Sequence, residues 1–199
     1  MMDRHETGNA ANEAVLDFMR TRRSVPAKTM GGPGPNEAEV TEMAKIASRV
    51  PDHGKIAPWR FIHYSDAAKI RLDECIFAHA REKFPDLAGD ALQIEAGRMA
   101  RSPVVIGLVS APCEHPKVPV WEQELSCGAA GLAWLIAANA HGYDAQWLTE
   151  WIAFDEILAK EFGCREGERI AGFIHIGTRT APKTERDRPE IGTVFTRMD

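Results

Sequence analysis

The sequence has few cysteines and no cysteine motif. The four cysteines, Cys75, Cys113, Cys127 and Cys164, lie far apart and form no C-x-x-C pair. Zinc ribbons and small disulfide-rich domains need closely spaced cysteines, so the spacing excludes both classes. It favours a reducing compartment, and we expect a cytoplasmic protein.

A long apolar run and an excess of positive charge are also missing. The best candidate for a membrane span, residues 125–140, contains Ser126 and Asn139 and falls short of the ~20 apolar residues that a bilayer requires. The formal net charge is -5, whereas nucleic-acid binding needs a basic surface. We therefore expect neither a membrane nor a nucleic acid as a partner. Residues 1–12 lack the apolar stretch of a secretory signal and are expected to be a disordered tail.

The familiar catalytic and metal-binding motifs are absent as well. There is no H-E-x-x-H, G-x-S-x-G, P-loop or G-x-G-x-x-G after a strand. The seven histidines show no metal-ligand spacing, so no metal site is expected. Glu122 and Glu124 could act as an acid/base pair, but carboxylates in the first turn of a helix are favoured by the helix dipole alone. We favour that structural interpretation.

What remains is the composition of an ordinary globular chain. Of its 199 residues, 44% are hydrophobic and 27% are charged, which suits one compact domain, here expected over residues 13–178. The order of the predicted elements, mostly helices with a few well-separated strands, indicates an α+β fold. Residues 179–199 are expected to be an extended tail, and residues 30–35 a linker or turn. Helices are predicted at 13–22, 36–47, 65–84, 87–101, 121–141 and 155–162. Strands are predicted at 59–64, 104–109 and 169–176, with a short strand or loop over 143–151.

The helix predicted over residues 121–141 is unusual because it is apolar nearly all round and contains Gly128 and Gly131. Glycine inside a helix costs roughly 1 kcal/mol relative to alanine. The two glycines therefore indicate close approach of another backbone or of a flat ligand. A helix without a polar face must be buried on all sides. A second copy of the chain would bury it, although the helix could also be the centre of a single-chain core.

Three short segments carry the candidate binding chemistry. Arg22, Arg23 and Ser24 end the first helix, and two guanidinium groups with a hydroxyl suit a phosphate. A polar loop runs from Arg49 through His53 to Pro58-Trp59, and Trp147-Leu148-Thr149 follows the long helix. Taken singly, each segment is weak, because paired arginines usually form a solvated surface.

In their order and spacing, these segments resemble the FMN-dependent nitroreductase family, specifically its compact single-domain branch. The resemblance covers residue 14 to about residue 178. It rests on RRS (22–24), R-x-P-D-H followed by P-W (49–59), KVPVWEQELSCGAAG (117–131), HGYDAQW (141–147) and EGERIAGFIHIGT (166–178).

The resemblance implies a small, mostly antiparallel sheet wrapped by helices, and an intertwined homodimer with FMN at the subunit interface. Carried over position by position, the FMN phosphate and ribityl chain would be held by Arg22, Arg23 and Ser24. Arg49 and His53 would reach the flavin of the partner subunit. The isoalloxazine ring would lie along Trp147, Leu148 and Thr149. A nicotinamide nucleotide would lie at Ala137, Ala138, Asn139, Ala140, His141 and Gly142, a stretch that equally suits an ordinary helix end.

The implied reaction is a ping-pong hydride transfer from NADH or NADPH, through the flavin, to a nitroaromatic, a quinone or a similar electron-poor acceptor. Because FMN carries the chemistry, no catalytic side chain is expected. The chain departs from the family pattern at Pro26, Lys55 and Ala57, and Lys28 is the cation nearest to Pro26. These departures leave open a flavin-binding sensor or storage protein without turnover, and also a structural dimer.

Overall fold

The computed structural model describes residues 11–198, and within them one antiparallel sheet forms the centre of the fold. The longest strand, β5, pairs with β3 on one side and with β4 and β1 on the other, while β2 borders β3 at the edge. The strands are β1 (Met30–Gly31), β2 (Trp59–His63), β3 (Val104–Ser110), β4 (Asp144–Leu148) and β5 (Arg169–Arg179). The predicted α+β class and the antiparallel sheet are confirmed.

Helices and 3₁₀ turns connect these strands, so that no two neighbouring strands form a tight hairpin. The α-helices of residues 11–198 are α1 (Glu13–Thr21), α2 (Glu37–Ala47), α3 (Asp66–Lys83), α4 (Gly89–Glu95), α5 (Val120–Ala140), α6 (Glu156–Glu161) and α7 (Ile191–Val194). The 3₁₀ turns are η1 (Ala27–Thr29), η2 (His53–Lys55) and η3 (Trp151–Phe154). None of these helices combines the length and the hydropathy that crossing a bilayer requires.

Local sequence signals explain where most of the helices begin. Helix α2 starts with a capping box, in which the Asn36 side chain accepts from the Glu39 N–H and the Glu39 carboxylate accepts from the Asn36 N–H. Ser65 caps α3, and Asp155 caps α6. The predicted bounds of α1, α2, α3, α5 and α6 agree with the structure within one residue.

The helix predicted over 87–101 is shorter in the structure. Helix α4 ends at Glu95, because the chain beyond it is drawn into a different conformation by the buried Asp73 of α3. The Asp73 carboxylate accepts from the backbone N–H groups of Met99 and Ala100, at 2.7 and 3.1 Å. These N–H groups are therefore not available for a continuing helix.

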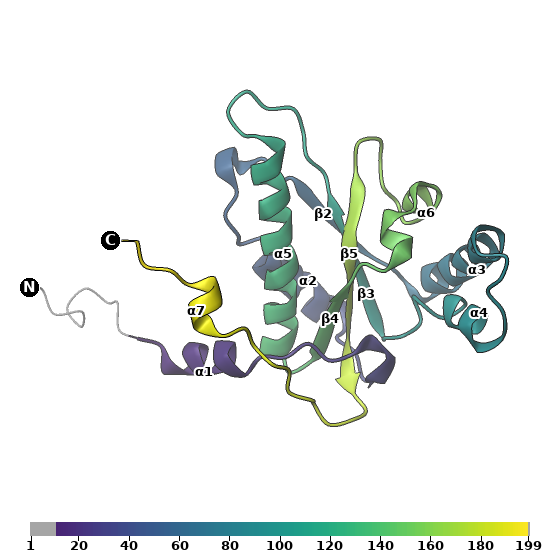
Figure 1. The fold of residues 1–199 in the computed structure, drawn as a ribbon, viewed down its shortest axis with the longest axis horizontal. Coiled ribbons are helices and arrows are strands. Elements are labelled where there is room, and N and C mark those ends of the chain that lie inside the picture. The colour runs from purple at the N-terminus through teal and green to yellow at the C-terminus, as the bar shows by residue number, and fades with distance from the viewer. Residues whose placement is uncertain (1–10, 199) are drawn as a thin grey trace, which may run out of the picture.

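The sheet is covered on both faces, which makes three layers (Figure 1). Helices α2 and α5 pack on one face, where Trp134, Ile174 and Ile176 contribute to a buried cluster. Helices α3 and α6 pack on the other face with η3, around Leu72, Phe162 and Phe173. Strand β3 is buried at all seven positions, as its continuous apolar sequence predicts.

The ends of the chain differ in part from the expectations. The segment 30–35, expected to be a linker or turn, contains the short strand β1, and β5 continues beyond the predicted residue 176 to Arg179. In the C-terminal segment, residues 180–198 contain the short helix α7 and otherwise no helix or strand. Most of the expected N-terminal tail, residues 1–10, lies outside the described residues. The division into tails and one domain stays a prediction.

Candidate functional site

The Arg22-Arg23-Ser24 segment lies beside strand β4, just after α1 ends. The backbone N–H of Val25 donates to the carbonyl of Ala145 at 3.3 Å. The N–H of Ala27 donates to the Gln146 side chain at 2.6 Å. These two hydrogen bonds attach the segment to the free edge of β4. The arginines therefore lie close to β4 in the folded structure.

Arg22 has an unusual environment for an arginine. Its Nη1 atom is buried and has no hydrogen-bond partner among the described residues. Burial lowers the pKa of Arg22, and the positive charges of Arg188 and Arg23 lower it further. A buried guanidinium with an unused donor, crowded by two further guanidinium groups, is the environment that an anion would stabilise. The residues present therefore fit a phosphate group.

The C-terminal segment completes this cluster of arginines. Arg23 donates from Nε and Nη2 to the carbonyl of Thr184, at 3.2 and 3.0 Å, and pairs with Glu185 at 3.2 Å. Arg188 lies 3.5 Å from the same Glu185 carboxylate. Sequence analysis missed Arg188, because it placed the domain boundary before this segment. The three basic residues between 183 and 188, Lys183, Arg186 and Arg188, were the available signal.

The loop with Arg49 and His53 packs against the first turns of α5. The Ser126 hydroxyl donates to the Pro51 carbonyl at 2.7 Å, and His53 Nδ1 lies 3.0 Å from a Glu122 oxygen. The Asp52 carboxylate accepts from the N–H groups of Ile56 and Ala57, at 3.1 and 2.8 Å. Arg49 and His53 are both exposed. Glu122 therefore belongs to this loop, whereas Glu124 pairs with Arg169.

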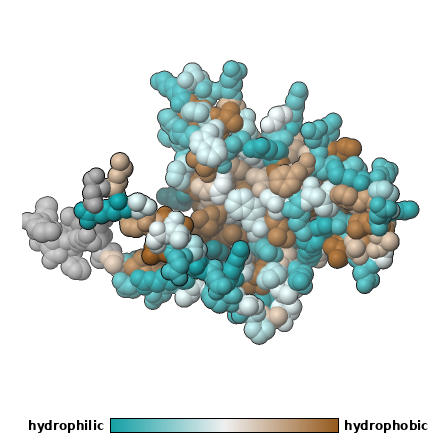
Figure 2. All heavy atoms as spheres, in the orientation of Figure 1, coloured by the Kyte–Doolittle hydropathy of each residue, from teal (hydrophilic) through white to brown (hydrophobic). Residues whose placement is uncertain are grey.

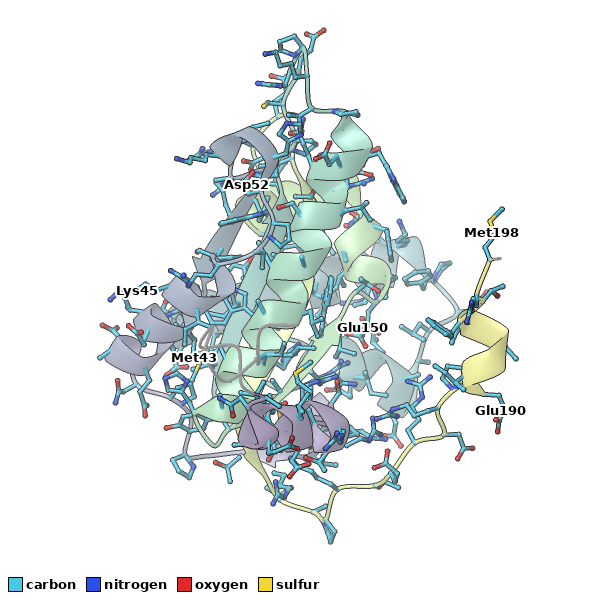
Figure 3. All side chains as sticks on the ribbon, turned by 90° about the vertical axis from the view of Figure 1, so that its left-hand side faces the viewer. Met43, Lys45, Asp52, Glu150, Glu190 and Met198 are labelled. Carbon is cyan, nitrogen blue, oxygen red and sulfur yellow. The ribbon has the colours of Figure 1, made fainter. Side chains whose placement is uncertain are left out.

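The loop and the end of β4 line two cavities on opposite faces of α5. The loop lines a cavity of about 560 Å³ with Glu122, Leu125, Ser126 and Ala129. A larger cavity, of about 1200 Å³, is lined by Glu124, Cys127 and Gly128. Successive helix residues turn by ~100°, so Glu122, Ser126 and Ala129 point away from Glu124 and Cys127. Leu125 and Gly128 lie between these two directions, on the side of α5 where the two cavities approach each other. Figure 3 shows Asp52 and Glu150 on different sides of α5.

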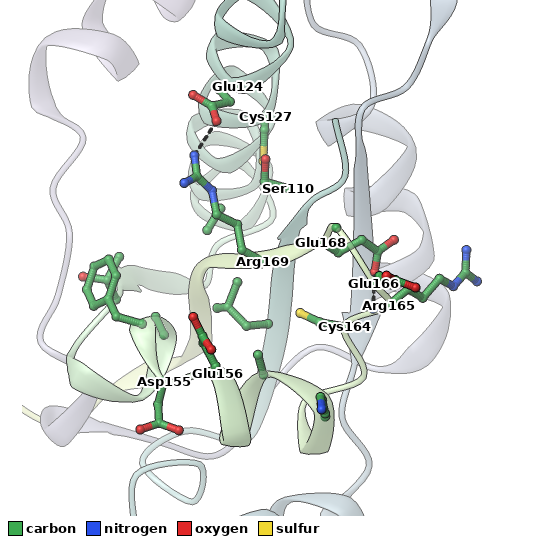
Figure 4. Close-up of a pocket in the computed structure, with 18 of the residues that line it drawn as sticks. Ser110, Glu124, Cys127, Asp155, Glu156, Cys164, Arg165, Glu166, Glu168 and Arg169 are labelled. Carbon is green, nitrogen blue, oxygen red and sulfur yellow. Dashed lines mark hydrogen bonds and ion pairs between the residues drawn. The ribbon is translucent and has the colours of Figure 1, made fainter. Parts of the chain in front are cut away.

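The residues at the end of β4 face two cavities. Trp147 and Thr149 line the larger one. Figure 4 shows other parts of its wall, with Cys127 on α5 and Arg169 on β5. The Trp147 indole is half-buried between α5 and β5, and its Nε1 donates to the Ala171 carbonyl at 3.1 Å. Leu148 lines a third cavity of about 450 Å³, together with Lys28. The end of β4 is thus open to ligands on both of its sides.

The end of α5 has the features of an ordinary helix terminus. Ala137 and Ala138 are buried in the core. His141 Nδ1 lies 2.8 Å from the Ala137 carbonyl, and Asn139 donates to the Tyr143 carbonyl at 2.9 Å. Gly142 has a φ of 87°, the left-handed conformation that glycine provides after a helix. Asn139 and His141 are half-buried, and Ala140 and Gly142 are exposed. The nucleotide position that the resemblance implies stays a prediction.

A family comparison decides the classification of the chain. Residues 19–178 match the Nitroreductase family. The chain belongs to this family. The matched range takes in every predicted site residue and ends just before the C-terminal segment.

Individual relatives agree with this assignment. The chain is 34% identical to the "Putative NAD(P)H nitroreductase" of Haemophilus influenzae over 181 residues, covering 90% of this chain and 95% of the relative. It is 32% identical to the "Putative NAD(P)H nitroreductase YdjA" of Escherichia coli K12, covering 82% and 87%. The fold resembles the nitroreductase-like family protein of Bacillus cereus, with a TM-score of 0.78 at 18% identity, covering 95% and 98% of the two chains.

A further solved structure has the same fold. It is the FMN and NADPH-dependent nitroreductase NfnB of a Sphigopyxis strain, in a mutant form, with a TM-score of 0.73 and 17% identity. The comparison covers 92% of this chain and 98% of that one. At this level of identity the likeness concerns the fold alone.

The cysteines and possible metal ligands of this nitroreductase-family chain were also considered, within residues 11–198. All four cysteines are free, and burial raises the pKa of Cys127 and Cys164 to about 11. Such thiols are poor nucleophiles at neutral pH. No group of three or more His, Cys, Asp or Glu residues within 11–198 is arranged to hold a metal ion.

Proposed function

We propose that the chain is an FMN-dependent NAD(P)H oxidoreductase. The observation that carries the proposal is the buried, unpartnered Nη1 of Arg22 beside Arg23 and Arg188, because a phosphate would supply the missing acceptor and the missing negative charge. The Nitroreductase family match supports it. So do relatives that are named as NAD(P)H nitroreductases.

Arg22, Arg23 and Ser24 would hold the FMN phosphate and ribityl chain. Trp147, Leu148 and Thr149 would lie along the isoalloxazine ring. Pro26 stands where many family members have a cation, and Lys28, which shares the cavity beside Leu148, would provide the positive charge instead. When bound, FMN supplies the redox chemistry between NADH or NADPH and the acceptor.

The second half of the site would come from another copy of the chain. Arg49 and His53 lie across α5 from the larger cavity, so they cannot join it within one chain. One face of α5 carries Trp121, Leu125, Gly128 and Leu132, at intervals of four, three and four residues. Trp121 is 68% exposed, Leu125 54% and Leu132 43%. A helical stripe of this kind favours packing against another helix.

We therefore propose a homodimer in which each copy supplies its Arg49 and His53 to the other's flavin. Figure 2 shows hydrophobic and near-neutral residues gathered at the centre of one face of the molecule, with hydrophilic residues around the rim. This distribution suits a protein interface. The sequence of α5 predicts a helix that is buried on all sides, but in the single chain one of its faces is exposed. The proposed homodimer would bury that face.

The larger cavity suits the electron acceptor. Its wall includes Trp147, Ala153 and Phe154, and Phe154 is 75% exposed. Lys160, Arg165 and Arg169 lie around it with several carboxylates. A flat, electron-poor nitroaromatic or quinone would stack on the apolar wall while the cations face its oxygens. In this arrangement the chain binds and orients the reactants and excludes water.

The purified protein tests the proposal directly. We expect the absorbance of bound FMN, either as isolated or after reconstitution with FMN, and anaerobic bleaching of that absorbance by NADH or NADPH. Protein that remains colourless after reconstitution contradicts any flavin-dependent role. Protein that binds FMN but is not bleached by either nucleotide supports the alternative of a sensor or storage protein.

A further inference from the structure

Glu150 has a backbone conformation that normally belongs to glycine. Its φ is 51° and its ψ is 179°, a region in which the β-carbon of other residues is crowded. Lys55 and Ala57 are the other non-glycine residues of 11–198 with positive φ. Glu150 directly follows Trp147-Leu148-Thr149, so the disfavoured conformation lies at the end of the strand along which the flavin is proposed to bind.

Two arginines hold the Glu150 carboxylate in place. Arg101 Nη1 lies 2.8 Å from both carboxylate oxygens, and Arg98 Nη1 lies 2.7 Å from one of them. The arginine side chains are largely buried, with exposed fractions of 16% and 10%. Ion pairs that are shielded from water in this way constrain geometry more strongly than pairs at the surface.

The same network continues into the neighbouring elements. Arg98 also pairs with Glu95, the last residue of α4. The Trp151 indole donates to Glu95 at 3.0 Å. The network therefore ties the chain around Glu150 and Trp151 to the chain that follows α4. If residue 150 were glycine, no ion-pair network would be needed to hold this conformation, because glycine adopts positive φ without strain.

The carboxylate of Glu150 is ionised at neutral pH. Burial raises its pKa, but the hydrogen bond and charge of Arg101 and the charge of Arg98 outweigh burial, and the pKa is lowered overall. Glu150 and Arg101 also line the cavity of about 450 Å³ that contains Leu148 and Lys28. The network thus forms a wall of the space next to the proposed flavin strand.

We infer that Glu150, Arg98 and Arg101 form a positioning device for FMN. Their ion pairs hold the peptide between Thr149 and Glu150 in the orientation in which the end of β4 meets the isoalloxazine ring. Without these pairs, a residue other than glycine at position 150 relaxes to negative φ and rotates that peptide away. The inference rests on the proposed FMN site, and the residues act through the backbone rather than on the reactants.

Two substitutions separate the backbone conformation from the carboxylate. Glu150→Gly and Glu150→Ala both remove the carboxylate, but only glycine accepts the observed φ without strain. FMN affinity is measured by quenching of FMN fluorescence during titration of apoprotein, and the absorbance spectrum of bound flavin is recorded. We expect Glu150→Gly to bind within about threefold of the unmodified protein, and Glu150→Ala to bind about tenfold or more weakly, with a spectrum closer to that of free FMN.

A double-mutant cycle gives a second measurement. It tests the inference even if circular dichroism shows that Glu150→Ala does not fold. Arg101→Gln is expected to weaken FMN binding by about fivefold or more in the unmodified background. In the Glu150→Gly background it should cause no further loss, because glycine no longer needs the pair.

Equal FMN affinities for Glu150→Ala and Glu150→Gly would overturn the inference. An equal effect of Arg101→Gln in both backgrounds would also overturn it. If the unmodified protein itself does not bind FMN, the proposed function fails, and that result is distinguished from these two because it precedes any substitution.

Discussion

The indole ring of Trp147 lies directly against the α-carbon of Gly131. A β-carbon added at Gly131 would stand 2.7 Å from Cζ3 of Trp147 and 2.8 Å from Cδ2 of Leu108. Helix α5 thus crosses β3 and β4 too closely for any side chain at this position. Sequence analysis predicted close approach of another backbone or of a flat ligand at Gly128 and Gly131. At Gly131 the closest groups are instead side chains of the same chain, and a β-carbon at Gly128 meets nothing within 4 Å among the described residues.

Replacing Gly131 with alanine is expected to lower the stability of the fold. The added methyl group must displace Trp147 or Leu108, and overpacking of this kind costs about 1–3 kcal/mol. The free energy of unfolding in urea measures the effect. Gly128→Ala is the matched control, because a β-carbon there meets nothing within 4 Å among the described residues and alanine improves helix propensity. Equal stability of the two variants would contradict the packing argument.

A bulky residue at Gly128 is expected to act on association instead. Gly128 belongs to the exposed α5 stripe, so Gly128→Trp leaves the single chain folded and obstructs the second copy. Analytical ultracentrifugation measures the assembly, and circular dichroism checks the fold. A variant that sediments as an undisturbed dimer would argue against the proposed interface.

Arg22→Ala is expected to weaken FMN binding. It removes a charge-assisted contact to phosphate, worth roughly 1.5–3 kcal/mol, or about 10- to 150-fold in affinity. Fluorescence titration with FMN measures the dissociation constant. Arg20→Ala is the control, because Arg20 pairs at the surface of α1 with Asp17. The assignment would be wrong if both variants retained the affinity of the unmodified protein.

Mixing two defective chains tests whether the site is shared. Arg22→Ala damages the proposed phosphate site in the segment beside β4, and His53→Ala damages the loop that packs against α5. If each flavin takes one half from each copy, an equal mixture that exchanges subunits regains about a quarter of the intact sites, because half of its dimers are mixed and each has one intact site. Activity and FMN content after mixing measure the recovery. No recovery, despite demonstrated subunit exchange, would place both halves in one chain.

The buried His175 predicts loss of stability in acid. Burial and the positive charge of Arg101 lower its pKa from 6.5 to about 4, and its Nδ1 lies 3.0 Å from the Ser102 hydroxyl. Between these two values the unfolded chain binds the proton and the folded chain does not, so stability falls as the pH falls. The contribution is about 3 kcal/mol by pH 4.

The slope of unfolding free energy against pH measures this contribution. His175→Gln should flatten the slope between pH 6.5 and pH 4. His63→Gln, at an exposed position, should leave it unchanged. An unaltered slope in the His175 variant would show that another group controls the acid transition.

Local signals predicted most of the fold. These signals are local, because each depends on only a few consecutive residues. Examples are the apolar runs around Val105 and Ile174, the Asn36 capping box and Gly142 at the end of α5. Strand β1 escaped prediction because its two residues form a strand only by pairing with Thr178 and Arg179, which are distant in sequence. Helix α4 was predicted too long because the limit set by Asp73 is a tertiary contact.

The candidate site was likewise predictable from the sequence only in part. The RRS segment and the loop around His53 were recognisable as motifs, but their separation by α5 is a property of the folded chain. Arg188 and the Glu150 network were not predicted. Arg188 approaches Arg22 only through the path of the C-terminal segment, and the positive φ of Glu150 contradicts the ordinary preference of its residue type.

The two proposed half-sites lie on different sides of α5 and cannot meet within one chain. FMN binding is therefore expected to depend on protein concentration. If every complete site needs two copies, dilution that separates the copies also releases FMN, and added FMN draws the copies together by mass action. The midpoint of dissociation should then move to lower protein concentration as FMN is raised. Specific activity should be constant only above that midpoint.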